Sequence, residues 1–76
     1  KINEAIRLIN AGKSDEAVTL LEPVADDRKW NTLGSALYMS GRKQEALDCF
    51  RKAVEAGNEG ARQNLEALER VLGISH

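Results

Sequence analysis

The sequence predicts an all-α protein built from stacked helical hairpins, and three observations lead to this prediction. Apolar and small residues recur three and four positions apart along most of the chain, which places them on one face of a helix. Glycines interrupt this spacing at intervals typical of short helices. The segment Gly12–Ala17 is similar to Gly41–Ala46. We therefore expect about five helices joined by short turns.

The first hairpin is expected to be short. Residues 2–10 carry a broad apolar stripe that stops before Gly12, so they predict a first helix. Ser14 is the expected cap of the second helix. Pro23 cannot lie deep in a helix, because its ring removes a hydrogen bond and clashes with the preceding turn. We therefore expect the second helix to end near Glu22, followed by an extended link.

The middle of the chain predicts a longer hairpin. A third helix is expected from Arg28 to about Met39, with Asp26 or Asp27 as its cap, and a fourth from Arg42 to Ala56. Small residues, Gly34 and Ala46, stand beside large ones, Trp30 and Phe50, in these two helices. Such pairs let two helices approach closely while rings fill the space around the contact. We expect this contact to form the core.

A fifth helix is expected between the cap Asn58 and the stop Gly73. Its predicted buried stripe consists of Ala61, Leu65, Leu68, Val71 and Leu72, and its predicted outer residues are Arg62, Glu66, Glu69 and Arg70.

The middle hairpin also resembles a known family. Residues Trp30, Leu33, Gly34, Ala46, Phe50 and Ala53 fall at the spacings of the tetratricopeptide repeat, a thirty-four-residue unit with the pattern W-x2-L-G-x2-Y, A-x3-F, P. Leu37 stands where the family usually has Tyr, and Asn58 where it usually has Pro. The resemblance implies a TPR-like α-α superhelix. It divides the single domain, residues 1–76, into a truncated repeat at about 1–25, a well-matched repeat at about 27–60 and a capping helix at about 59–72.

Composition excludes several classes of partner. The 76 residues carry a formal net charge of -1, with both signs interspersed, so we expect neither nucleic-acid binding nor attraction to an acidic membrane. No apolar run approaches the roughly 20 residues that cross a bilayer, so no membrane insertion is expected. The chain begins at Lys1 with no initiator Met, and we interpret it as a fragment of a longer protein. The sequence does not distinguish a cytoplasmic from a periplasmic location.

Catalysis has little support in the sequence. The one histidine, His76, is at the C-terminus, and the one cysteine, Cys49, stands beside Phe50 in the expected fourth helix, where a buried and inert thiol is expected. No phosphate loop or cluster of metal ligands is present. We therefore predict no enzyme, no cofactor and no metal site.

The resemblance implies a protein-interaction module, in which the first helix of each hairpin lines a concave groove that binds a peptide or partner protein. The groove residues predicted on this basis are Arg28, Asn31, Ser35, Tyr38, Arg62, Glu66 and Glu69. Uncharged amides and hydroxyls beside a tyrosine can pair with a peptide backbone without burying a full charge. A minor reading is a clamp for a C-terminal carboxylate, but its set of cations is incomplete.

An alternative function follows from the first helix. If Ala5 and Leu8 face inward, Ile2, Ile6 and Ile9 form an apolar patch that drives self-association or meets another repeat. The chain would then be a structural spacer or a self-association segment attached to another domain. The same stripe fits an internal core equally well.

Overall fold

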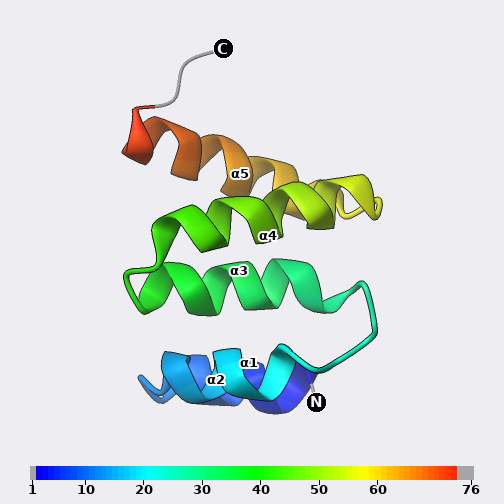
Figure 1. Ribbon diagram of the computed structural model, residues 1–76, viewed down its shortest axis with the longest axis vertical. Coiled ribbons are helices and arrows are strands. Elements are labelled where there is room, and N and C mark those ends of the chain that lie inside the picture. The colour runs from blue at the N-terminus through cyan, green and yellow to red at the C-terminus, as the bar shows by residue number, and fades with distance from the viewer. Residues whose placement is uncertain (1, 74–76) are drawn as a thin grey trace.

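The computed structural model describes residues 2–73, and over these residues it is all helical (Figure 1). The five helices are α1 (Ile2–Asn10), α2 (Ser14–Leu21), α3 (Lys29–Met39), α4 (Lys43–Glu55) and α5 (Glu59–Leu72). The predicted all-α helical repeat is therefore confirmed.

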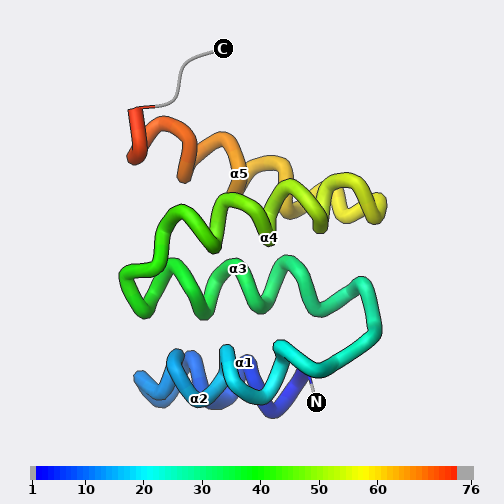
Figure 2. Tube along the Cα trace, in the orientation of Figure 1, coloured from blue at the N-terminus to red at the C-terminus, as the bar shows by residue number. Residues whose placement is uncertain are grey.

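The helices form a stack in which successive helices run in opposite directions (Figure 1). The strongest contacts are between α3 and α4, followed by α4 with α5, α1 with α2 and α2 with α3, and α1 also touches α3. The stack measures 34 × 24 × 17 Å. Figure 2 shows that α1 and α2 lie at one end of its long axis and α5 at the other. Each helix thus packs mainly on its neighbours in the chain, as expected of a helical repeat.

The contact between α3 and α4 is the centre of the core. Gly34 is buried in α3, and a Cβ atom at this position would lie only 2.7 Å from Cε1 of Phe50. Ala46 is fully buried and Phe50 is 4% exposed, so the predicted close approach of small and large residues is confirmed. Trp30 differs from the expectation, because it is only partly buried. Its ring lies under two amines, the Nζ atoms of Lys29 at 4.7 Å and Lys52 at 4.5 Å.

The two similar sequence segments form the same turn. Gly12 and Gly41 both have positive φ, 79° and 84°, which favours glycine over any residue with a Cβ. The residue after each glycine donates its N–H to a carbonyl five positions back, from Lys13 to Leu8 over 2.7 Å and from Arg42 to Leu37 over 2.9 Å. This long bond closes the C-terminus of the preceding helix in the manner of a Schellman motif.

Two of the predicted caps are displaced. Ser14 is the first residue of α2 and makes no cap, and its hydroxyl instead accepts a hydrogen bond from the hydroxyl of Ser40 over 3.0 Å. Asp26 accepts the N–H of Arg28 over 2.9 Å, so it stabilises the turn before α3 while Arg28 itself occupies the cap position. Asn58 does cap α5, since its side chain accepts the N–H of Ala61 over 3.2 Å.

The second helix is short, as predicted, because α2 ends at Leu21 just before Pro23. Its end is held by a contact that the sequence did not suggest. Lys29 is only 7% exposed, and its amine donates to the carbonyl of Glu22 over 2.8 Å. This amine satisfies a carbonyl that the interrupted helix leaves without a backbone donor.

The buried face of α5 is partly different from the prediction. Ala61 and Leu68 are buried, and Leu65 and Leu72 pack against the core. Val71, which was expected inside, is 55% exposed, whereas Glu69, which was expected outside, is 8% exposed. The helix is therefore rotated so that one flank of the predicted stripe turns outward.

Candidate partner-binding surface

A pocket opens where α3, α4 and α5 meet. Its volume is about 170 Å³, and it is lined by Tyr38, Phe50, Asn64, Ala67, Leu68 and Val71. Phe50 and Leu68 belong to the core, whereas Tyr38 and Val71 are 40% and 55% exposed. The lining therefore combines an apolar interior with a phenol and an amide, a combination typical of sites that bind part of a larger molecule.

Of the predicted groove residues, Asn31, Ser35 and Tyr38 belong to α3, and Asn31 and Tyr38 lie next to α5. The amide of Asn64 donates to Oδ1 of Asn31 over 3.0 Å and so joins α5 to α3. The hydroxyl of Ser35 donates to the carbonyl of Asn31 over 3.2 Å. Asn31 and Ser35 are half-buried and already engaged inside the molecule. Of these three, only Tyr38 is exposed and lines the pocket.

The ring of Tyr38 lies near the positively charged amine of a lysine. The Nζ atom of Lys43, at the start of α4, lies 5.9 Å from the ring centroid. At this distance the ammonium group is attracted by the ring face, although at an exposed site this is worth only about 0.5–1 kcal/mol. The lining residues of the pocket carry no charge, and the amine of Lys43 lies near its exposed edge at Tyr38.

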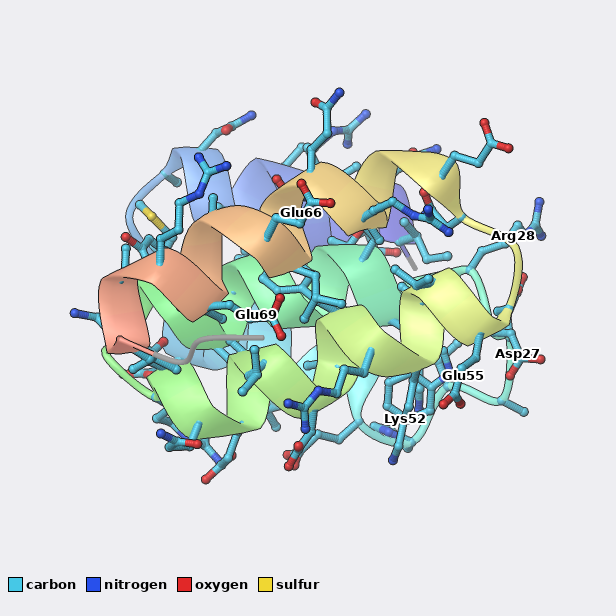
Figure 3. All side chains as sticks on the ribbon, turned by 90° about the horizontal axis from the view of Figure 1, so that it is seen from above. Asp27, Arg28, Lys52, Glu55, Glu66 and Glu69 are labelled. Carbon is cyan, nitrogen blue, oxygen red and sulfur yellow. The ribbon has the colours of Figure 1, made fainter. Side chains whose placement is uncertain are left out.

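Arg28 lies apart from this pocket, at the N-terminal end of α3. Its guanidinium binds Asp26 through Nε, at 3.0 Å and 3.1 Å, and through Nη2, at 2.6 Å. These bonds, together with the backbone N–H of Arg28, lower the pKa of Asp26 to about 2. The side chain of Arg28 is 84% exposed, and Figure 3 shows it at the edge of the stack. The predicted grouping of Arg28 with Tyr38 is therefore not observed.

The predicted residues of α5 also separate. Arg62 and Glu66 line a shallow depression with Glu59 and Gln63 on one face of α5. Figure 3, which looks down on α5, shows Glu66 over the helix and Glu69 on the side toward α4. Because Glu69 is buried, it is not available on the same surface as Arg62 and Glu66. The structure thus places the seven predicted residues in several locations.

Reasoning from the sequence missed Asn64, Ala67 and the exposure of Val71. Asn64 could not be singled out, because an asparagine on a polar helix face has no distinguishing spacing. The repeat period of the family could have identified these positions. With a period of thirty-four residues, Asn64, Ala67 and Val71 correspond to Trp30, Leu33 and Leu37. The small or polar residues at the first two positions indicate that α5 packs differently from α3.

The predicted isoleucine patch is largely covered. Ala5 is fully buried, and Ile2, Leu8 and Ile9 pack partly against the core. Ile6 alone among the residues of the patch is exposed, at 43%. Ile2 and Ile9 are half-buried, because the apolar stripe of α1 is wide enough to contact both α2 and α3.

The expectation of a buried thiol at Cys49 is confirmed. Cys49 is 7% exposed, and its burial raises the pKa of the thiol, which disfavours the reactive thiolate. Residues 2–73 contain no group of three metal-ligating side chains. None of their helices is long and apolar enough to span a bilayer. His76 lies outside the described residues.

Part of the chain matches one known protein family. Residues 28–57, which comprise α3, α4 and the turn between them, match the family model of the tetratricopeptide repeat. A search of curated proteins and a search of solved structures gave no match.

Proposed function

We propose that the chain binds an extended peptide segment of a partner protein where α3 meets α5, and the premise is that residues 28–57 match the family model of the tetratricopeptide repeat. Repeats of this family serve in general as protein-interaction modules. The observation that carries the proposal is the open pocket beside Tyr38, which combines apolar walls with polar groups at its edge.

The chemistry of the pocket favours a peptide over a small charged metabolite. Phe50, Leu68 and Val71 offer an apolar site for one side chain of the partner. The phenol of Tyr38 and the amide of Asn64 can bind peptide groups beside that anchor, since both side chains donate and accept hydrogen bonds. Tyrosine is also enriched among residues that dominate binding energy, because a rigid aromatic ring loses little entropy on binding.

The proposal is tested by selecting peptides from a random display library on the immobilised chain and measuring their affinities by fluorescence anisotropy. Tyr38→Ala should weaken selected peptides about tenfold, the usual result of truncating an aromatic interface anchor. Ala67→Glu should weaken them similarly, because it places a charge in the pocket. Arg51→Ala, on the exposed face of α4, is the control and should bind normally. Selected peptides that bind both pocket variants as tightly as the parent would refute the proposal.

A second candidate function is self-association through α1. It is favoured by the exposure of Ile6, a large aliphatic side chain of α1 that is 43% accessible. Under this proposal the chain is a structural spacer whose copies associate. Sedimentation equilibrium separates the two functions: Ile6→Asp should abolish association and leave peptide binding unchanged. A parent chain that stays monomeric at all concentrations would exclude this second function.

A further inference from the structure

A second groove lies between α2 and α4, and its residues are distinct from those of the Tyr38 pocket. Its volume is about 280 Å³. The floor is apolar and consists of Trp30, Leu33 and Leu37, and the rim carries three carboxylates, those of Glu22, Glu45 and Asp48. None of the functions considered above uses this surface.

The groove lies beside the end of the shortened second helix. α2 has 8 residues, whereas α4 has 13, and α2 ends at Leu21 because Pro23 follows. Five further residues would extend a helix by about 7.5 Å. Glu22, Lys29 and Trp30 line the space beyond this end. The C-terminus of a helix also carries a partial negative charge, which favours cations there.

Lys29 shows that a cation is accommodated at this position. Its aliphatic stem is buried, and its amine donates to the carbonyl of Glu22 over 2.8 Å. A second amine, that of Lys52, lies over the indole ring of Trp30, with its Nζ atom 4.5 Å from the ring centroid. Both amines therefore contact groups other than the carboxylates of the rim.

The residues that line the groove include three carboxylates and one amine, and the carboxylates differ in how closely they are paired. Glu22 makes no ion pair with any residue of the described range 2–73. Asp48 has only a distant partner, Arg51 at 4.0 Å, and its side chain is 69% exposed. Glu45 is paired more closely, with Arg42 at 2.5 Å. Three carboxylates thus face one lining amine, that of Lys29, and two of them are available to a cation from outside.

We propose that this groove receives an arginine or lysine side chain from a segment of a partner protein. The aliphatic stem of the incoming residue lies over Trp30 and the two leucines, and its charged head lies between Glu22 and Asp48. Long basic side chains commonly bury their stems on apolar surface while the head remains solvated. Charge complementarity of this kind determines which partner binds and how fast it associates.

The test is an NMR titration of the full chain, labelled with nitrogen-15, with a blocked tetra-arginine peptide. Tetra-citrulline is the comparison peptide, because it has nearly the same shape without the charge. Tetra-arginine should shift the amide signals of Glu22, Lys29 and Cys49, and tetra-citrulline should not. Glu22→Gln combined with Asp48→Asn should weaken tetra-arginine about three- to tenfold, since each exposed ion pair contributes about 0.2–1 kcal/mol.

The control variant combines Glu59→Gln with Glu66→Gln on α5, which removes the same number of charges elsewhere. This variant should bind tetra-arginine as the parent does. Equal weakening in both double variants, or shifts spread over α5, would mean that the peptide senses only overall charge and would overturn the proposal. The Tyr38→Ala variant should retain this binding, so failure here is distinguishable from failure of the peptide-binding function. Circular dichroism confirms that each variant is folded.

Discussion

At residue scale, Gly34 determines how closely α3 and α4 approach. An added Cβ would lie 2.7 Å from Cε1, 2.8 Å from Cδ1 and 3.0 Å from Cζ of Phe50. Phe50 is buried, so its ring cannot move away without disturbing its neighbours. Gly34→Ala should therefore lower the free energy of unfolding by about 1–2 kcal/mol, because overpacking outweighs the roughly 1 kcal/mol gained in helix propensity.

Urea denaturation measures this change, and Phe50 provides the control. In a Phe50→Leu background the side chain at position 50 is smaller, so Gly34→Ala should cost less than in the parent or become stabilising. A double-mutant cycle gives the coupling between the two positions. If Gly34→Ala costs the same in both backgrounds, contact with the phenyl ring is not the reason for glycine at this position.

Asp26 predicts a specific pH dependence. The hydrogen bonds from Arg28 lower the pKa of Asp26 from 3.8 to about 2. Because the folded-state pKa is depressed, the contribution of this pair is complete above the ordinary carboxyl pKa and is lost as the pH falls through about 2. NMR titration of the carboxyl carbon should give a pKa of about 2 in the parent chain and a higher pKa in Arg28→Gln, which loses the guanidinium but keeps the backbone N–H at position 28. Arg51→Gln should leave the titration of Asp26 unchanged, and an unshifted pKa in the parent would contradict the ion pair.

At the scale of elements, Lys29 holds the end of α2. Lys29→Met keeps most of the buried stem but removes the donor to the carbonyl of Glu22. Loss of this charge-assisted bond should lower the free energy of unfolding by about 1–3 kcal/mol. Lys52→Met is a matched control, because its amine lies at a similar distance from the Trp30 ring but is bonded to no carbonyl. Thermal unfolding of the two variants should differ clearly, and equal melting temperatures would show that only the contact with the ring matters.

The extent of each element could be predicted from the sequence because helix starts and stops depend on local chemistry. Pro23 ends α2, and Gly12, Gly41 and Gly73 follow helix ends with positive φ. Which residues of α5 are buried could not be predicted in full. Its apolar residues cover a wide arc, and which part becomes buried depends on α3 and α4. The exposure of Val71 and the burial of Glu69 result from packing against the other helices. The spacing of residues within one helix does not predict them.

At the scale of the whole molecule, the location of the candidate site depends on contacts between distant parts of the chain. Tyr38 could be selected from the sequence, since an aromatic residue on an uncharged helix face is unusual. Its neighbours could not, because the bond between Asn31 and Asn64 spans 33 positions and requires α5 to lie beside α3. The predicted groove was drawn from the regular family pattern, and the rotation of α5 moved Glu69 out of it.

Packing between neighbouring helices also determines how the molecule should open. α3 and α4 each bury five residues, whereas α1 buries only Ala5. In helical repeats stability is approximately a sum over neighbouring units, so an end helix with few buried residues opens at a lower free energy than the middle. Native-state hydrogen exchange should therefore be fastest in α1 and slowest at Leu37 and Phe50. Adding low concentrations of urea should accelerate the slowest amides more than those of α1, because only global unfolding exposes the centre. Equal protection in all five helices would instead mean that the stack opens as a single unit.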